Sequence, residues 1–405
     1  MALDIQTSKN DVSPSRPGRT LLSHNQKWAL GFLAVAVFVF ILYQFVIPNL
    51  NDAGQSFFQD WIPLSSVNEC LVWVICALGL NVVVGYAGLL DLGFVAFWAI
   101  GGYTAGWLMS TFFSQWSVNV LGSVAPGSPG IHFTFWIVLV IGAALCAFFG
   151  LLIGAPTLRL KSDYLALVTL GFGEIIPQVF KNGDDIGGFN LTNGIKGITP
   201  VDPIQVGGKK LGPFDLEWRY VIFVAIAALV IFVSLRIREG RLGRAWLAIR
   251  EDELAASMMG VPLMRTKLAA YAVGAMAGGL GGVAFATHIS GVLQDRFNFS
   301  ISITLLAMVV LGGMGNVWGV TIGALVLAWI NSTGLPQTGN AINDALGTDI
   351  PFSSFNYLVF GLILVLMMLF RREGLLPETR TRQLLREPER GEIEAVHADM
   401  EGFSE

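Results

Sequence analysis

The chain has 405 residues, of which 54% are hydrophobic and only 13% are charged. A soluble domain has about 25% charged residues, so this composition excludes an ordinary soluble protein. The net charge of −4 does not by itself indicate a class of partner. We expect the lipid bilayer to be a partner and expect no nucleic acid.

The cysteines and histidines give no sign of a metal site. Cys70, Cys76 and Cys146 lie in apolar runs, where they are most simply interpreted as small core residues. No cysteine pair has metal-ligand spacing, and the four histidines are scattered. We therefore expect no metal and no cofactor bound by this chain.

Apolar runs define the predicted membrane domain. Residues 1–27 are polar and are predicted to form a cytoplasmic tail. The runs that follow are 28–48, 63–84, 90–113, 133–154, 164–180, 218–236, 267–289, 300–330 and 354–370. Runs of about 20 apolar residues can cross a bilayer core of about 30 Å. We expect a transmembrane domain over 28–370 and a cytoplasmic tail over 371–405.

The run 300–330 is too long for one ordinary helix, because it would extend about 46 Å at 1.5 Å per residue. It is interrupted by Gly312-Gly313-Met314-Gly315-Asn316. We predict two helices, Ser300–Leu311 and Val317–Ile330, each too short to span alone. Broken helices are tolerated where they are buried in protein or line a cavity. The predicted fold class is all-α, a polytopic membrane protein with about ten transmembrane or half-spanning helices.

Lysine and arginine positions predict the orientation, because short cytoplasmic loops are enriched in them. Basic residues gather in the N-terminal tail, in the links 155–163 and 237–266, and at Arg371 and Arg372. This pattern places both termini in the cytoplasm. Segment 182–217 falls outside and is a mild exception, because it contains three lysines.

Two short segments with similar sequences predict an internal repeat. Residues 83–88 read Val-Val-Gly-Tyr-Ala-Gly, and residues 309–315 read Val-Val-Leu-Gly-Gly-Met-Gly. Both turns are predicted on the cytoplasmic side, between an inward and an outward segment. Internal repeats of this kind are common in transporters.

Glycines recur every four residues in two places. On a helix, each set forms a flat stripe that allows another helix to pack closely. Packing within the subunit is the simpler interpretation, and a dimer seam or a moving gate is the alternative. The two sets are Gly274, Gly278 and Gly282, and Gly315, Gly319 and Gly323.

Charged residues within membrane segments are costly and usually functional. Glu174 is the strongest candidate for a group that faces a pathway, against a buried structural role. Asp91 either caps the third span or belongs to the pathway. Asn81 and Asn316 are placed to satisfy backbone freed at helix breaks. The candidate pathway residues are Asn81, Asp91, Thr169, Glu174 and Asn316.

The link 237–266 contains a short predicted amphipathic helix around Glu251 to Gly260. Apolar and charged residues alternate there at helical spacing, and Gly260 suits a C-cap. The helix either lies on lipid or docks into a partner's groove. The candidate docking residues are Arg244, Arg250, Glu251, Glu253, Ala255, Ala256 and Gly260.

No energy-providing site is visible in the sequence. It contains no G-x-x-x-x-G-K-[ST] phosphate loop, and no G-x-G-x-x-G follows a strand. We therefore expect a transport subunit rather than an enzyme. Active transport would require either a separate ATPase or an ion gradient.

Five ordered segments resemble permeases of branched-chain amino-acid ABC importers. The resemblance covers roughly residues 60–370, and its motifs are 80–93, 163–176, 191–198, 243–253 and 308–315. It implies a second, homologous permease, two cytoplasmic ABC ATPase subunits that use ATP and Mg²⁺, and an extracytoplasmic amino-acid-binding protein. It also implies a bacterial inner membrane location and ATP-driven import by alternating access.

The resemblance departs from the importer pattern in the docking loop. There, ABC importers carry E-A-A-x-x-x-G. Ala255, Ala256 and Gly260 fit that spacing, but Leu254 stands at the Glu position and Glu253 is one residue early. This departure weakens the transfer of individual docking residues more than the docking hypothesis itself.

Other functions remain open at this stage. Related permeases transport urea and short amides. A different class, an ion-coupled secondary transporter, would use Glu174 and Asp91 as its coupling site, and a passive channel or scaffold is a third reading. The sequence leaves the substrate open, as well as the choice between a homodimeric and a heterodimeric pore.

Overall fold

The computed structural model describes residues 24–371 and 374–376, apart from positions 123, 125–126, 161, 207, 213–214 and 349–350. The predicted tails 1–27 and 371–405 lie almost entirely outside these residues, as do Lys161 and Arg372. Only 24–27 of the predicted N-terminal tail is described, and it begins the first helix.

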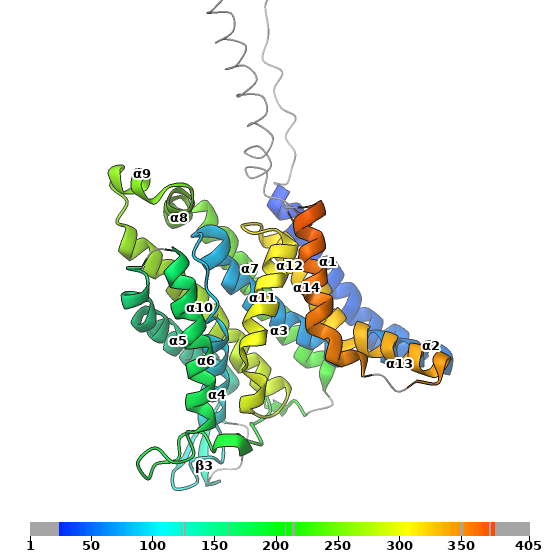
Figure 1. Cartoon of the computed structure of the whole chain (residues 1–405). Helices are drawn as coiled ribbons and strands as arrows, with labels where there is room; N and C mark the ends of the chain where they lie inside the picture. Colours follow the sequence, from blue (N-terminus) through cyan, green and yellow to red (C-terminus); the bar gives the residue numbers. More distant parts are fainter. Residues whose placement is uncertain are drawn as a thin grey trace, which may run out of the picture.

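Helices make up nearly all of the described fold (Figure 1). The helices of the first half are α1 (His24–Ile41), α2 (Asp52–Trp61), α3 (Leu64–Leu80), α4 (Val95–Leu108), α5 (Phe135–Thr157), α6 (Ser162–Lys181) and α7 (Leu216–Glu239). Those of the second half are α8 (Arg241–Glu251), α9 (Glu253–Met258), α10 (Leu263–His288), α11 (Phe299–Gly312), α12 (Val317–Trp329), α13 (Leu335–Leu346) and α14 (Asn356–Phe370).

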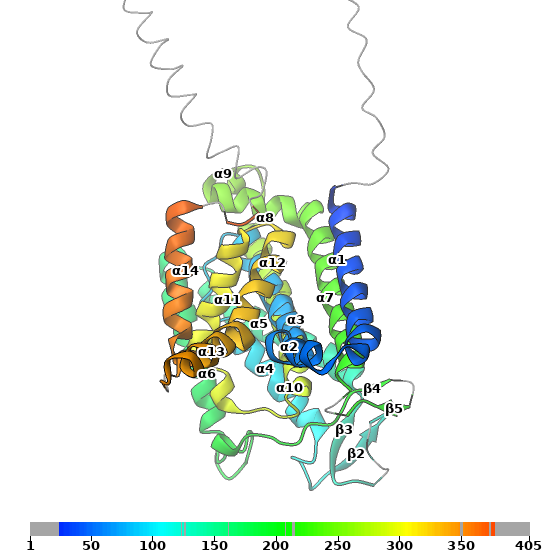
Figure 2. The ribbon, with the colours of Figure 1, turned by 90° about the vertical axis from the view of Figure 1, so that its right-hand side faces the viewer.

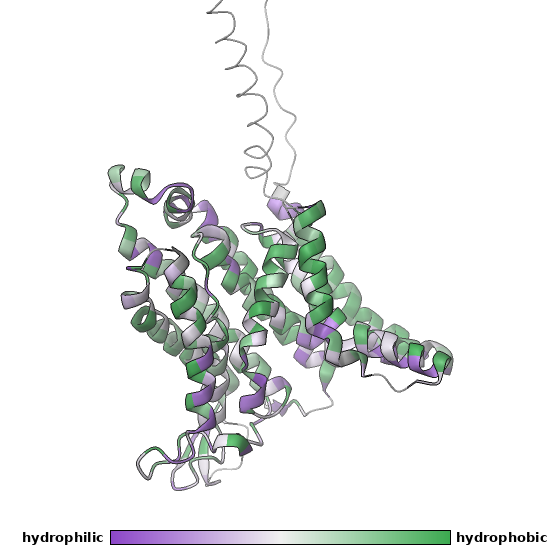
Figure 3. Ribbon diagram, in the orientation of Figure 1, coloured by the Kyte–Doolittle hydropathy of each residue, from purple (hydrophilic) through white to green (hydrophobic). Residues whose placement is uncertain are grey.

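The membrane fold class predicted from composition is confirmed. Within the described residues, seven helical segments are long and apolar enough to cross a membrane, and α14 is a shorter apolar helix. Helix α4, which is shorter, and helix α6, which is more polar, pack against these segments. Hydrophobic residues run along the upright helices of the bundle (Figure 3).

The predicted break in the run 300–330 is also confirmed. α11 ends at Gly312 and α12 begins at Val317, within one residue of the predicted bounds. The predicted end at Ile330 is wrong, because a π-helical turn, η6 (Ile330–Gly334), carries the chain directly into α13. The helical segments Gln294–Gly312 and Val317–Leu346 are both long and apolar enough to cross a membrane, so the prediction that each helix is too short to span alone is wrong.

Two amphipathic helices, α2 and α13, were missed because neither contains a long apolar run. Figures 1 and 2 show them next to each other, and in Figure 1 they project from one side of the bundle. The Trp329 indole at the end of α12 donates a hydrogen bond to the Trp61 carbonyl at the end of α2, at 2.9 Å.

Helix α10 forms the centre of the bundle and packs against α3, α4 and α5. Its glycine stripe lies at these contacts: a Cβ added at Gly278 would lie 2.9 Å from Phe97 Cβ, and one at Gly282 would lie 2.7 Å from the Gly102 nitrogen. The stripe therefore serves packing within the chain. Gly319 and Gly323 likewise meet α11 backbone. Gly315 does not share their face, because it lies in the turn at φ +89°.

Small sheets occupy the end of the bundle opposite α8 and α9 (Figure 2). In one, β3 (Gly130–Phe133) pairs parallel to β2 (Ser117–Val120) and antiparallel to β1 (Met109–Ser110). The other is the hairpin of β4 (Gln205–Val206) and β5 (Lys209–Lys210). The loop 182–217 and the link 237–266 thus lie at opposite ends, as the orientation analysis requires.

A buried contact between a histidine and an aspartate joins two segments at the sheet end. His132 Nδ1 lies 2.6 Å from Asp202 Oδ2, and the Asp202 amide bonds to the Met109 carbonyl at 2.7 Å. Burial raises the pKa of Asp202, and the contact with His132 opposes that shift. The pair links β3 to the segment that precedes β4.

Candidate functional site

Two helix breaks meet at the end of the bundle that carries α8. The π-helical turn η3 (Asn81–Tyr86) ends α3, and its Asn81 Oδ1 accepts a hydrogen bond from the Gly315 amide at 2.9 Å. Arg250 of α8 donates a hydrogen bond to the Gly85 carbonyl. The two turns that echo each other in sequence are therefore in contact, and α8 is tied to them. The internal repeat itself stays a prediction.

Asn316 closes the second break. Its Oδ1 accepts from the Trp318 amide at 3.1 Å, and its Nδ2 donates to the Leu376 carbonyl at 2.9 Å. The Leu375 and Leu376 amides bond to the carbonyls of Leu311 and Gly312. Both asparagines thus satisfy backbone groups at the breaks, as we expected.

Asp91 and Thr169 lie together inside the bundle, 1% and 0% exposed. Asp91 Oδ1 accepts from the Gly93 amide at 2.9 Å, and its carboxylate interacts with the Tyr271 side chain. The Leu92 amide donates to Thr169 Oγ1 at 3.1 Å. These contacts hold the loop before α4 between α6 and α10. Asp91 does not cap α4, because it bonds to Gly93, before the helix, whereas the first helical amide, Val95, donates to Ser302.

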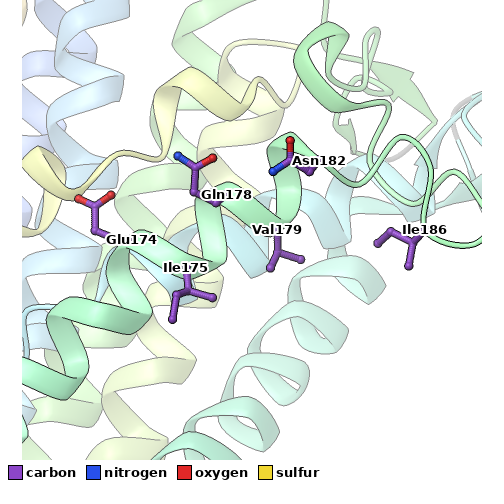
Figure 4. A pocket seen from close by; sticks show the side chains of 6 residues that line it. All are labelled: Glu174, Ile175, Gln178, Val179, Asn182 and Ile186. Atoms are coloured by element: carbon purple, nitrogen blue, oxygen red, sulfur yellow. The ribbon is translucent and has the colours of Figure 1, made fainter.

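Glu174 stands apart from these buried groups, on an exposed face of α6. It lines a surface groove of about 450 Å³ together with Gln178 and Asn182 and with the apolar side chains of Ile175, Val179 and Ile186. In Figure 4, the three polar side chains point to one side of α6, while Ile175 and Val179 point to the other. Gln178 and Asn182 were missed, although their four-residue spacing from Glu174 places them on one helix face.

The exposed polar face of α6 restricts what can surround it. A carboxylate that faces lipid is costly, so such groups normally face protein or water within the membrane. Glu174, Gln178 and Asn182 are all exposed in this chain. This face therefore suits contact with a second subunit or with an aqueous pathway.

The predicted short helix around Glu251 to Gly260 is found as α9, which begins two residues later than predicted, and a separate helix, α8, precedes it. The chain breaks at Asp252, whose Oδ1 accepts from the amides of Leu254 and Ala255 at 2.8 and 3.0 Å and caps α9. The predicted C-cap is confirmed: Gly260 has φ +83°, and its amide bonds to the Ser257 carbonyl at 3.0 Å.

Several side chains fasten α8 and α9 to the bundle. Trp246 is fully buried, and its indole donates to the Thr266 carbonyl at 2.7 Å. Lys267 pairs with Glu253 at 2.6 Å, and Ala256 is buried. Arg250, Glu253 and Ala256 are thus anchors, whereas Arg244, Glu251 and Ala255 are exposed.

The outer surface of α9 is apolar. Leu254, Met258 and Met259 are 67%, 78% and 85% exposed, respectively. The docking prediction missed the two methionines, although consecutive methionines before a capping glycine were visible in the sequence. Glu253 and Ala256 attach the opposite side of α9 to the bundle. The position of α9, and therefore of its exposed apolar side chains, is fixed.

Comparison with known proteins places these features in a family. The family model described as branched-chain amino acid transport system / permease component matches residues 62–368. This chain belongs to that family. The matched range includes α3 to α12, and therefore both helix breaks, the α6 groove and α9.

Individual relatives agree with the family assignment. The chain is 35% identical over 337 residues to the high-affinity branched-chain amino acid transport system permease protein LivM of Escherichia coli (strain K12), covering 78% of this chain and 70% of that protein. A probable LivM of Methanocaldococcus jannaschii is 25% identical, covering 77% and 93%. LivH of E. coli K12 is 30% identical over 156 residues, covering 38% and 45%. No solved structure matches significantly.

Proposed function

We propose that this chain is one of two permease subunits of an ABC importer that moves branched-chain amino acids inward. Two cytoplasmic ATPase subunits would supply the energy with ATP and Mg²⁺, and an extracytoplasmic binding protein would deliver the substrate. The location would be a bacterial inner membrane, with both termini and α8–α9 in the cytoplasm.

The observation that carries this proposal is the anchored apolar surface of α9. Leu254, Met258 and Met259 are exposed on a short helix whose opposite side is fixed by Glu253, Ala256 and the Asp252 cap. A helix with apolar residues on one face suits a hydrophobic groove of a partner. Arg250 lies on the neighbouring helix α8 and bonds to Gly85. Helix α8 therefore connects α9 to the helix break at 81–86.

The second permease is proposed to cover the exposed polar face of α6. Glu174, Gln178 and Asn182 would then line a pathway between the two subunits rather than face lipid. The similarity of this chain to both LivM and LivH of one E. coli transport system supports a heterodimer of homologous permeases.

Reconstitution into proteoliposomes tests the proposal. The chain, the second permease and the binding protein are assayed for leucine and urea uptake, with and without the ATPase subunits. We expect leucine uptake that requires both the ATPase subunits and ATP. Uptake driven by an ion gradient in the absence of the ATPases would instead support a secondary transporter, and preferential uptake of urea would correct the substrate.

Impermeant thiol labelling tests the orientation. Met258→Cys on α9 and Ile195→Cys on the opposite end are both at exposed positions, at 78% and 69%. In intact cells without the ATPase subunits, we expect labelling at position 195 only. Labelling at position 258 from outside would reverse the topology and remove the proposed docking role.

A further inference from the structure

A second cavity, of about 330 Å³, lies among α3, α4, α10, α11 and α14. None of its lining residues lines the α6 groove. The volume is at the small end of the roughly 300–1,000 Å³ typical of small-molecule sites. The cavity is thus large enough for a small metabolite.

The mouth of this cavity carries charges of both signs. Glu69 comes from α3, and Asp295 and Arg296 come from the turn η5 (Gln294–Arg296) that precedes α11. Asp295 and Arg296 are exposed, whereas Glu69 is half-buried beside Trp73, whose indole donates to Glu69 Oε1 at 3.4 Å. Carboxylates and a guanidinium in one cavity suit a ligand that itself has an ammonium and a carboxylate group.

The inner wall is aromatic. The rings of Trp73 and Trp98 meet edge to face with centroids 4.7 Å apart, and those of Trp98 and Phe285 do so at 5.1 Å. Phe360 closes the wall from α14. Together these rings offer an apolar surface next to the charged mouth, which matches a ligand with an apolar side chain.

Polar atoms in the wall lack partners. Trp98 is fully buried, yet its indole N–H has no hydrogen-bond partner among the described residues. Asn356 donates to Asn331 Oδ1 at 2.9 Å, but its own Oδ1 is buried without a partner in the described part of the chain. A buried polar group without a partner is costly, and a bound polar ligand would relieve that cost.

We propose that this cavity binds one zwitterionic α-amino acid with an apolar side chain. The ammonium group would face Glu69 and Asp295, the carboxylate would face Arg296 and the Trp98 indole N–H, and the side chain would lie against Trp73, Phe285 and Phe360. The inference rests on the proposed function in one respect, namely that the bound amino acid is the transported substrate. It adds a substrate site inside a single permease subunit.

Cysteine protection tests the site directly. Ser300 lines the cavity, and the native Cys70, Cys76 and Cys146 are buried. Ser300→Cys in the assembled transporter, in nanodiscs of phosphatidylcholine and phosphatidylglycerol, is labelled with a maleimide in the presence of leucine or urea. We expect leucine to slow labelling and urea to have no effect. Asn298→Cys, also at the cavity, is the second reporter in case the first variant folds poorly.

Charge variants identify the recognition groups. Glu69→Gln and Arg296→Gln should each raise the leucine concentration needed for protection about tenfold, as expected for a lost charge-assisted hydrogen bond. The matched controls Asp60→Asn and Lys196→Gln change exposed charges outside the cavity and should leave protection unchanged. Equal effects in variants and controls would overturn the proposed recognition.

Other outcomes separate the competing occupants. A lipid headgroup such as phosphatidylethanolamine has a similar charge pair, so protection conferred only by adding that lipid would overturn an amino-acid site. Equal protection by leucine and urea would overturn the zwitterion. Uptake is measured with the same purified transporter reconstituted into proteoliposomes: ATP-dependent leucine uptake without protection rejects the cavity site alone, whereas protection without ATP-dependent uptake rejects the proposed function alone.

Discussion

Helices α6 and α10 both contain glycines and pack in the same bundle, yet they have different relations to the rest of the chain. On α10, Gly278 and Gly282 bring the helix into contact with α4, where a Cβ would collide with side chain or backbone. On α6, Gly171 has nothing within 4 Å of its added Cβ, and Glu174, Gln178 and Asn182 are exposed. A buried α10 therefore stabilises the subunit, whereas an exposed α6 face is available for function.

The largest expected effect comes from Gly282→Leu. A side chain there would meet the Trp98 carbonyl and the Gly102 nitrogen, and backbone cannot move away as a flexible side chain can. Overpacking costs about 1–3 kcal/mol even in cores that adjust, so we expect loss of the folded protein. Gly171→Leu on α6 is the matched control and should leave the melting temperature and the monodisperse yield near wild type. Equal losses in both variants would contradict the comparison.

Glu174→Gln tests the α6 face. If this carboxylate lines the pathway, ATP-dependent leucine uptake should fall about tenfold, the scale of a lost charge-assisted hydrogen bond, while the melting temperature stays unchanged. Glu217→Gln, at the first turn of α7, serves as the control. Wild-type uptake in Glu174→Gln would remove this residue from the pathway.

Met258→Asp extends the comparison to α9, where the exposed surface is apolar instead of polar. The side chain is 78% exposed, so the permease should fold normally. Because a charge would be placed in a hydrophobic groove, we expect co-purification of the ATPase subunits to fall several-fold, in line with an interface cost of about 1–2 kcal/mol. Ile195→Asp, at a position 69% exposed at the opposite end of the bundle, is the matched control. Undiminished co-purification would place the docking surface elsewhere.

Tyr271→Phe should have the smallest effect. Tyr271 of α10 interacts with Asp91, in the loop that Thr169 of α6 also holds, so it joins the two helices that we compare. Loss of this interaction should lower the free energy of unfolding by about 1 kcal/mol. A double-mutant cycle with Asp91→Asn checks the coupling, and additive effects would show that the two side chains do not act together.

Much of the architecture was predictable because membrane helices must satisfy their own backbone in an apolar solvent. The glycine break at 312–316 and the Gly260 cap were predictable for another reason. Positive φ angles favour glycine, so glycines mark the places where a helix ends. The docking link was located, but its division at Asp252 was missed, because a side-chain cap within a helical pattern depends on local geometry.

The sequence by itself determined that the chain crosses the membrane repeatedly, that the run 300–330 breaks at its glycines and which family the chain belongs to. Only the tertiary structure decided which face of each helix is buried. It separated Glu174 from the buried Asp91 and Thr169, and it gathered Glu69, Arg296 and Trp98 from distant segments into one cavity. The physical reason is that a run of apolar residues indicates whether a helix is surrounded by lipid or by water. A site, in contrast, depends on contacts between residues that are far apart in the chain.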